Sequence, residues 1–332
     1  MKEIYKDIYT FEVPLPKSAL KAINIYVIKA PDRAIVIDTG YNTKESIEYM
    51  EDNLGKLDLE IKDCDLLLTH LHADHTGLAA FFYENGCNVY IGKVDGDLMN
   101  DMRKDSYWAN FMTRLPLFGM EGELLLKDYI GYRYRLSHEI NYNVLDIGEK
   151  INIGDYELEV VDIKGHTPGH IGFYERNKGF MFAGDTVLDP ITPNITFWEY
   201  KYGNILGTYI KTLKKIRTFN LNTIFSSHRK LIDNPNERID EIIYHHHLRL
   251  QEILDSMDSS RDDYTIREIS TKISWRIRAK DWDDFPIPQK WFAVGETMAH
   301  VVYLIDYGYI SEKKVDGILM LKKLKDKLSS ID

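Results

Sequence analysis

The segment His70–His75 constrains this chain more than any other part of its sequence. Its side chains His70, His72, Asp74 and His75 place three imidazoles and a carboxylate within six positions. A chance cluster of core histidines is disfavoured, because burying three neighbouring imidazoles without a ligand leaves several ring nitrogens in need of partners. Imidazole and carboxylate groups suit Zn²⁺, Fe or Mn²⁺ and need no thiolate. The segment therefore predicts a metal site.

The residues before this cluster predict an α/β fold. The apolar runs Ile23–Ile28 and Ala34–Gly40 are typical of buried strands, and Thr43 is placed to cap a helix over Lys44–Leu54. A third apolar strand, Asp65–Thr69, ends directly before the histidines. Since α/β sheets bind ligands beyond the carboxyl ends of their strands, this is a natural place for a site. On a strand-to-helix turn, the first two histidines can face one side while the aspartate and the third histidine turn toward a second centre.

The strand pattern stops over residues 96–143. Aromatic residues such as Trp108 recur there mostly at helical spacings, which predicts a helical insertion. The insertion either packs its own apolar face or forms a lid that narrows a pocket and selects substrates. Strands return at Leu158–Ile163, Phe180–Ala183 and Thr223–Ser227, so a second strand–helix–strand block echoes the first.

A change of pattern after Ile232 predicts a second, smaller domain. Three helical patterns are followed by a glycine-containing turn and a last apolar stretch: Asn236–Met257, Thr265–Ile277, Phe292–Ile305, Asp306–Ile310 and Leu319–Leu328. We expect a metal-binding domain over residues 1–235 and a helical, winged-helix-like domain over residues 236–332.

Composition narrows the class of function. The formal net charge is −10, which disfavours wide non-specific binding to nucleic acid. The only cysteines, Cys64 and Cys87, are too few for a disulfide-stapled secreted protein, and we expect both to be buried and reduced. The first residues have no apolar run typical of a signal peptide, and no stretch approaches the roughly 20 apolar residues that span a bilayer. We therefore expect a cytoplasmic chain with no membrane partner.

Further motifs accompany the histidine cluster in a fixed order. They are Val36–Gly40, Gly165–His170, Phe182–Thr186 and Ser226–His228. With His70–His75, they make the chain resemble the metallo-β-lactamase superfamily over most of its first two thirds, and several ordered motifs are more specific than any one alone. The resemblance implies an α/β fold of the αββα sandwich type. It further suggests a glyoxalase II-like hydrolase, from the branch with a winged-helix-like C-terminal tail.

The resemblance also implies the ligands of two divalent metal ions, most simply Zn²⁺, with Fe or Mn²⁺ as alternatives. Each ion would have three side chains of its own and both would share one carboxylate: His70, His72 and His166; Asp74, His75 and His228; and the shared Asp185. Two ions about 3.5–4 Å apart can trap a bridging water and deliver hydroxide at neutral pH. The family assigns to Asp74 the catalytic role of holding the nucleophile or taking a proton.

Residues next to these ligands are also implicated. In the family, Asp38 supports the ligands from behind, and His170 either does the same or makes a structural hydrogen bond. One departure concerns His228, which the family commonly flanks with glycines but which here stands between Ser227 and Arg229. This departure bears on the occupancy of the second site. Arg229 either holds a negative group of a substrate or makes a surface ion pair.

Other polar residues give weaker signals. A lysine or tyrosine from this half of the chain often binds the polar tail of a substrate in the family, and Lys230, Tyr200 and Tyr202 are candidates that nothing in the sequence ranks. The consecutive histidines 245–247 lie on a predicted helix, where neighbouring side chains point about 100° apart and cannot share one metal well. We expect at most one of them to face inward.

The leading functional hypothesis is a dinuclear metal-dependent hydrolase that cleaves a thioester, lactone or ester of a small molecule. One alternative is a phosphodiesterase or ribonuclease, which would need a cationic track for its strand. Another is an enzyme with a single iron that oxidises a persulfide with two histidines and one aspartate as ligands. A third is a binding protein that retains the metal site. An exposed apolar face on the insertion or the tail could support a homodimer.

Overall fold

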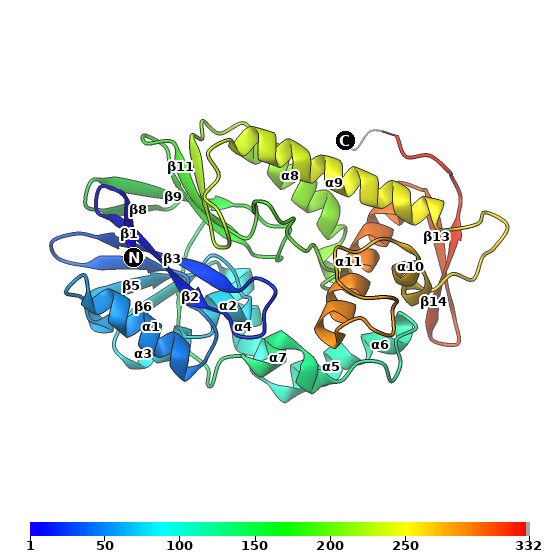
Figure 1. Ribbon diagram of the computed structural model, residues 1–332, viewed down its shortest axis with the longest axis horizontal. Helices are drawn as coiled ribbons and strands as arrows, with labels where there is room; N and C mark the ends of the chain where they lie inside the picture. The colour runs from blue at the N-terminus through cyan, green and yellow to red at the C-terminus, as the bar shows by residue number, and fades with distance from the viewer. Residues whose placement is uncertain (330–332) are drawn as a thin grey trace.

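Two β-sheets packed face to face form the centre of the computed structural model, which describes residues 1–329 (Figure 1). The first sheet has the order β1-β2-β3-β4-β5-β6-β7, with strands at Lys2–Tyr5, Ile8–Pro14, Ala22–Lys29, Ala34–Ile37, Cys64–Leu67, Asn88–Ile91 and Asn143–Val144. Strands β1 to β4 pair antiparallel and β4 to β7 pair parallel. The second sheet has the order β12-β11-β10-β9-β8, with strands at Thr223–Ser226, Phe180–Gly184, Ile171–Glu175, Tyr156–Asp162 and Lys150–Ile153. Here β11 and β12 pair parallel, and the other pairs are antiparallel.

Strands that are buried on both faces explain the uninterrupted apolar runs of the sequence. In β3, Ile25 and Val27 belong to an outer cluster shared with the helices, whereas Tyr26 and Ile28 belong to the core between the sheets. Successive side chains point to opposite faces of a strand, so each central strand supplies both cores. The core between the sheets is rich in aromatic rings, and the centroids of Tyr26 and Phe182 are 5.2 Å apart across it.

Helices cover the outer faces of both sheets and complete four layers, αββα. Helices α1 (Lys44–Gly55) and α3 (Ala79–Glu84) lie against the first sheet, and α8 (Ile205–Ile216) and α9 (Pro235–Asp255) lie over the second (Figure 1). Thr43 caps α1 as predicted, because its hydroxyl accepts a hydrogen bond of 3.1 Å from the Ser46 amide. The α/β sandwich predicted from the sequence is confirmed.

The predicted helical insertion lies between β6 and β7. It contains four helices and one 3₁₀ turn within the described residues: α4 (Lys93–Met102), α5 (Asp105–Met112), α6 (Arg114–Leu117), η2 (Leu126–Asp128) and α7 (Ile130–Arg133). The helical stretch begins before residue 96 and ends well before residue 143, which already belongs to β7. Trp108 is fully buried inside the insertion, where its ring lies near those of Phe111, Tyr129 and Tyr132. Trp291 near the C-terminus also contacts Phe111 and Tyr129, so the insertion shares its aromatic core with the C-terminal segment.

The C-terminal segment contains α10 (Ile266–Lys272), α11 (Ile287–Asp306) and the hairpin of β13 (Ile310–Val315) and β14 (Ile318–Lys323). Helix α10 stops before the predicted end at Ile277, and α11 starts before the predicted Phe292, with Pro288 in its first turn, where a missing amide hydrogen costs nothing. Part of the last apolar stretch, Leu319–Leu328, forms strand β14. One hydrophobic cluster runs from Phe11 to Leu321, so this segment shares its core with the rest of the chain.

Two remaining expectations concern cysteines and membranes. Cys64 and Cys87 are buried and make no disulfide, as expected. Within residues 1–329, no helix combines the length and the apolar character needed to cross a bilayer.

The aromatic core between the sheets gives a first prediction. Replacing Phe182, which is almost fully buried, by Ala should lower the free energy of unfolding by about 3–5 kcal/mol, because the cavity adds to the lost transfer free energy. Urea denaturation measures this effect. The control Ile147→Ala removes a side chain from a residue that is 57% exposed and should change stability by about 0.5 kcal/mol or less. Equal effects of the two substitutions would contradict the described core.

Candidate metal centre

The predicted ligands lie on loops that follow strands of both sheets. Grouped by the strand that they follow, they are His70, His72, Asp74 and His75 after β5, His166 after β9, Asp185 after β11 and His228 after β12. Asp74 and His75 belong to a short helix, α2 (Ala73–Thr76). The parallel pairs β4–β5 and β11–β12 bring their carboxyl ends to one edge of the sandwich. All of these side chains meet there, in groups whose ligand atoms lie within 4.8 Å of one another.

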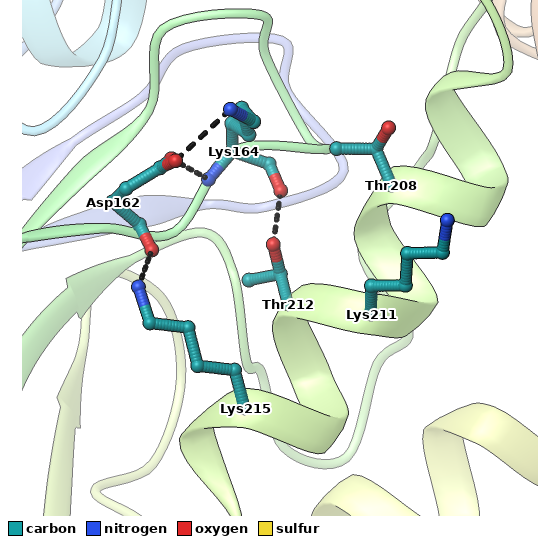
Figure 2. A pocket seen from close by; sticks show the side chains of 6 residues that line it. All are labelled: Asp162, Lys164, Thr208, Lys211, Thr212 and Lys215. Atoms are coloured by element: carbon teal, nitrogen blue, oxygen red, sulfur yellow. Dashed lines mark hydrogen bonds and ion pairs between the residues drawn. The ribbon is translucent and has the colours of Figure 1, made fainter.

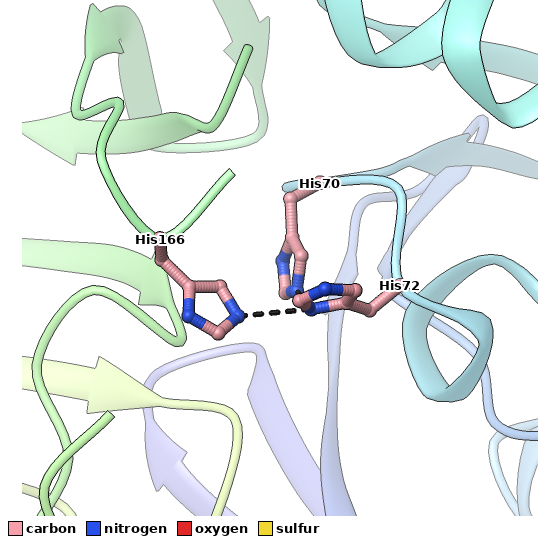
Figure 3. A group of neighbouring side chains, drawn as sticks. All are labelled: His70, His72 and His166. Carbon is pink, nitrogen blue, oxygen red and sulfur yellow. Dashed lines mark hydrogen bonds between the residues drawn. The ribbon is translucent and has the colours of Figure 1, made fainter. Parts of the chain in front are cut away.

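His70, His72 and His166 form the first group, and their ring nitrogens converge (Figure 3). The Nδ1 atom of His72 lies 3.1 Å from Nε2 of His70 and 2.9 Å from Nε2 of His166. The Nδ1 atoms of His70 and His166 make hydrogen bonds with atoms outside the group. His70 Nδ1 lies 3.1 Å from the Thr69 hydroxyl, and His166 Nδ1 lies 3.0 Å from the carbonyl oxygen of Asn194. These bonds aim the Nε2 lone pairs at one point, where a cation could be held.

Asp74, His75 and His228 form the second group, with Asp185 between the two. His228 Nε2 lies 3.4 Å from an oxygen of Asp74 and 3.4 Å from Oδ1 of Asp185. His75 Nε2 lies 3.5 Å from the same Oδ1. The other oxygen of Asp185 lies 3.6 Å from His166 Nε2, in the first group. One carboxylate is thus in position to contact a cation in each group.

Three buried polar atoms of the candidate ligands have no hydrogen-bond partner in the described part of the chain: His75 Nε2, His228 Nε2 and Asp185 Oδ1. Leaving a buried polar atom unsatisfied costs about 1–3 kcal/mol, so three that face one another need a common explanation. A divalent cation would satisfy all three, and nitrogen and oxygen donors of this kind suit Zn²⁺, Fe or Mn²⁺. The residues therefore fit a metal ion.

Asp38 holds His75 from behind. Its Oδ2 lies 2.8 Å from His75 Nδ1 and accepts a hydrogen bond of 2.8 Å from the Thr69 hydroxyl. Its Oδ1 accepts a bond of 2.9 Å from the Thr69 amide, and the Ser227 hydroxyl donates to Oδ2 at 3.4 Å. Asp38 has a φ of 61°, a left-handed conformation that costs a non-glycine residue about 1–2 kcal/mol. The hydrogen bonds offset that cost and turn His75 Nε2 toward the second group.

His170 lies directly behind His70, with ring centroids 4.4 Å apart. Its Nδ1 lies 3.3 Å from the Thr186 hydroxyl. Only glycine fits at position 184, because a Cβ there would lie 2.4 Å from Nε2 of His170. His170 belongs to none of the converging groups in residues 1–329, so it packs against a candidate ligand and does not join the set.

Asp95 is a residue of the site that sequence reasoning missed. It lies fully buried in the first turn of α4 and accepts hydrogen bonds from the Leu71 amide at 3.1 Å, the Thr167 hydroxyl at 2.5 Å and the Gly169 amide at 2.6 Å. Burial raises the pKa of Asp95 to about 7, and the three hydrogen bonds oppose that rise. Asp95 therefore ties the loop of His70 and His72 to the loop of His166. Its only sequence signal is a carboxylate soon after the short apolar run that forms β6.

Trp198 is a second residue of the site that sequence reasoning missed. Its indole stacks on the ring of His72, with centroids 5.7 Å apart and an angle of 24° between the planes. Its Nε1–H donates to the carbonyl oxygen of His166 at 3.2 Å. Trp198 thus contacts two of the three histidines of the first group, although it lies far from both in the sequence.

The electrostatics differ between the two groups. Burial lowers the pKa of His72 to about 3 and also lowers the pKa of His70 and His166, which keeps these imidazoles neutral and able to donate lone pairs. Burial has the same tendency at His75 and His228, but nearby carboxylates outweigh it and raise the pKa of both. The second group therefore attracts positive charge, which a metal ion would supply.

The remaining candidates lie outside these groups. The Arg229 guanidinium donates to the carbonyl oxygen of Ala19 at 2.6 Å, and its backbone φ of 65° is one that glycine adopts more easily. Lys230 and Tyr200 are exposed, and Tyr202 is half-buried in the 3₁₀ turn η3 (Tyr200–Tyr202). Of these, the structure singles out none as a substrate contact.

Among the consecutive histidines of α9, only His246 is fully buried, as predicted. Its Nδ1 lies 3.0 Å from Nε2 of His300 in α11. The pair joins two helices and lies apart from the converging groups.

A separate cavity of about 240 Å³ lies on the loop between β9 and β10 and on α8 (Figure 2). It is lined by Asp162, Lys164, Thr208, Lys211, Thr212 and Lys215. Asp162 engages two of the lysines, by an ion pair of 3.0 Å to Lys164 and a backbone carbonyl that accepts at 2.9 Å from Lys215. The lining contains none of the converging histidines, so this cavity is distinct from the candidate metal centre.

Comparisons with known proteins place this geometry in context. A sequence profile described as the metallo-beta-lactamase superfamily matches residues 20–228. The probable metallo-hydrolase YqjP of Bacillus subtilis is 24% identical over 249 residues, which cover 71% of this chain and 76% of that protein. The human acyl-coenzyme A thioesterase MBLAC2 is 24% identical over 175 residues, which cover 50% of this chain and 58% of that protein.

Solved structures extend the similarity to the C-terminal segment. The crystal structure of a metallo-beta-lactamase family protein from Thermus thermophilus superposes with a TM-score of 0.83 and 26% identity, covering 97% of this chain and 100% of that one. A beta-lactamase domain protein from Burkholderia ambifaria superposes with a TM-score of 0.80 and 22% identity, covering 97% of this chain and 93% of that one. The insertion and the C-terminal helices therefore recur together with the sandwich.

The buried Asp95 gives the second prediction. Asp95→Asn should lower the free energy of unfolding by about 1–3 kcal/mol. Both carboxylate oxygens of Asp95 accept hydrogen bonds, and in the variant an NH₂ group would replace one of these oxygens and face a donor. The matched control is Asp97→Asn on the same helix, where an exposed carboxylate pairs with Lys93 at 3.0 Å and should contribute about 1 kcal/mol or less. Urea denaturation of both variants decides the point, and an equal loss would show that Asp95 does not hold the loops together.

Proposed function

This chain belongs to the metallo-beta-lactamase superfamily, and we propose that it is a dinuclear metal-dependent hydrolase that cleaves a thioester. The observation that carries the proposal is the set of unpartnered atoms on His75, His228 and Asp185, which face one another in a buried site. These atoms call for a second cation beside the one that the three histidines of the first group could hold. Hydrolysis of a lactone or another ester would use the same arrangement.

The proposed ligands follow the two groups. His70, His72 and His166 would hold the first ion, Asp74, His75 and His228 would hold the second, and Asp185 lies near ligands of both groups. When bound, the two ions would supply a hydroxide nucleophile at neutral pH and a Lewis acid for the substrate carbonyl. The donors, imidazoles and carboxylates, suit Zn²⁺, Fe or Mn²⁺, and we take Zn²⁺ as the leading candidate.

The protein side chains orient the reaction. Asp74 has one oxygen 3.4 Å from His228 Nε2, and the surrounding histidines hold its pKa low in spite of burial, so it is a carboxylate at neutral pH. It can accept a hydrogen bond from the attacking water and take its proton when the carbonyl is attacked. The thiol side of the cleaved bond leaves as a thiolate or takes up a proton from solvent. Asp38 and Asn194 keep the histidine rings in place from behind.

Three findings favour thioester hydrolysis over nuclease activity and persulfide oxidation. The human relative MBLAC2 carries the name of an acyl-coenzyme A thioesterase, which is a precedent for this reaction in the family. A nuclease would need a cationic track, whereas this chain has a net charge of −10. A persulfide-oxidising enzyme with one iron would leave His228 and its neighbours without a partner.

We also propose that the insertion forms one wall of the substrate site. Tyr134, at the end of α7, stacks on Tyr41, with ring centroids 4.2 Å apart. Tyr41 lies only three residues beyond Asp38, and nearby Asp74 and Asp185 add to the effect of burial in raising its pKa. Arg114 of α6 pairs with Glu199 at 2.9 Å and donates to the carbonyl oxygen of Trp198. The insertion thus touches the segments on two sides of the centre.

The number of metal ions is the third prediction. Freshly purified protein should contain about two equivalents of zinc, manganese or iron per chain, and His228→Ala should hold about one. Elemental analysis measures both values. His247→Ala, a half-buried histidine of α9, is the control and should keep both ions. One tightly held iron that survives His228→Ala would remove His228 from the site and favour the redox alternative.

Catalysis gives the fourth prediction. His72→Ala should lower kcat/KM for a chromogenic thioester by about a thousandfold or more, because the metal centre supplies several kcal/mol of transition-state stabilisation and each 1.4 kcal/mol is a factor of ten. Parallel assays with lactone, ester and phosphodiester substrates test the alternatives. Salt-sensitive cleavage of RNA in place of thioester hydrolysis would contradict the proposal.

The wall formed by the insertion gives the fifth prediction. Tyr134→Ala should raise KM for a thioester more than it lowers kcat, because the ring touches Tyr41 and none of the candidate ligands. Tyr83→Ala, at a partly exposed site on α3, serves as the control. A fall in kcat at unchanged KM would place Tyr134 in a different role.

A further inference from the structure

The C-terminal helix α11 is connected to the first group of histidines by a short chain of hydrogen bonds. Asn194 is the middle link: its carbonyl oxygen lies 3.0 Å from Nδ1 of His166, and its side-chain amide donates to Oε2 of Glu296 at 2.8 Å. Glu296 lies on α11 and is buried. Glu296 and Asn194 are 102 positions apart in the sequence, so only the fold creates this connection.

The segment around Asn194 is pressed closely against α11. The Phe197 amide donates to the carbonyl oxygen of Gly295 at 2.9 Å. A Cβ on residue 295 would lie 2.1 Å from the Thr196 hydroxyl oxygen, so a larger residue would force the Thr196 side chain to move. A glycine within a helix lowers its stability by about 1 kcal/mol relative to alanine. The close approach of the segment around Asn194 explains why a glycine is found at this position of α11. The next residue, Trp198, donates to the carbonyl oxygen of His166 itself.

The Glu296 carboxylate is fixed from its other side. Its Oε1 lies 3.5 Å from Nε of Arg249 in α9, and Arg249 also donates to Glu252 at 2.7 Å and to the carbonyl oxygen of Ser274 at 2.6 Å. Burying a carboxylate is costly unless it is paired and hydrogen-bonded. Within residues 1–329, the Glu296 carboxylate has one cationic neighbour, Arg249, and one hydrogen-bond donor, Asn194, which belongs to the segment that orients His166.

We propose that Glu296 is a positioning residue for His166, and that the C-terminal segment thereby completes the first metal site. A hydrogen bond from Nδ1 fixes the tautomer and the orientation of a ligating imidazole. The Asn194 carbonyl accepts that bond, and Glu296 holds Asn194 where it can do so. Without Glu296, the Asn194 side-chain amide would keep the longer bond of 3.4 Å to the Phe292 carbonyl oxygen but lose the shorter one, and His166 would offer its Nε2 lone pair with less precision. The inference rests on the proposed role of His166 as a metal ligand.

The test is a double-mutant cycle read by metal affinity. Asn194→Ala removes the amide that reaches Glu296 and keeps the backbone carbonyl that faces His166. Glu296→Leu removes the carboxylate at similar volume. Each single variant should weaken the first-site ion by about 10–100-fold, as substitutions behind metal ligands do, when metal is titrated against a competing chelator. The double variant should be no weaker than the worse single variant, because both act through one link.

Two controls separate positioning from general destabilisation. Glu296→Gln keeps an acceptor for Asn194 and should restore most of the affinity. Thr297→Ala, next to it on α11, removes a fully buried hydroxyl that accepts from Ser270 at 2.9 Å, and it should lower stability while leaving metal affinity unchanged. Visible spectra of the Co²⁺-loaded proteins should change in the Asn194 and Glu296→Leu variants but not in Thr297→Ala.

The outcomes are distinguishable. Repeating the titrations in a His228→Ala background, which the proposal leaves with the first site alone, assigns the weakened step. If the wild-type protein binds two ions and the Asn194 and Glu296 variants lose only stability, or if their effects on affinity add, the positioning role is overturned and the proposed function stands. If the wild-type protein binds no metal, both are overturned together.

Discussion

The candidate site depends on one physical constraint, which is the free-energy cost of burying three unpartnered polar atoms at one point. His75 Nε2, His228 Nε2 and Asp185 Oδ1 come from three separate segments and face one another without a hydrogen bond. A fold loses conformational entropy when it brings such segments together, and here it adds a desolvation penalty that a cation at this point would relieve. The metal ions proposed for this site are therefore part of the balance that holds the strand ends together.

The surroundings of the site are built to keep it rigid. Asp38 has a left-handed backbone conformation, and in this conformation its carboxylate contacts His75 and accepts a hydrogen bond from Thr69. Asp95 bonds to both loops that carry the first group of histidines. The insertion and the C-terminal helix α11 both reach the segment of residues 194–199, from Arg114 on one side and Glu296 on the other. Parts of the chain that look like additions to the sandwich thus contact a segment beside the candidate metal centre.

The sequence predicted what depends on local pattern. The buried strands, the cap at Thr43 and the converging side chains of His70–His75 are encoded by residue type and short spacing, and the fold class is confirmed. Helix ends were predicted less well, because α10 stops and α11 starts where tertiary packing and proline decide.

The residues that sequence reasoning missed share one property. Asp95, Trp198 and Glu296 act through partners that are distant in the sequence, and nothing near them in the chain marks their role. A buried carboxylate and an exposed one look alike in a sequence, as Asp95 and Asp97 demonstrate on a single helix. Only the arrangement of the sheets and loops separates them.

The most direct test of the account is a crystal structure of the zinc-loaded protein with anomalous data collected at the zinc edge. The account predicts two peaks about 3.5–4 Å apart, one among His70, His72 and His166 and the other among Asp74, His75 and His228, with Asp185 between them. A single peak at the first group, with water bonded to His75 and His228, would contradict it.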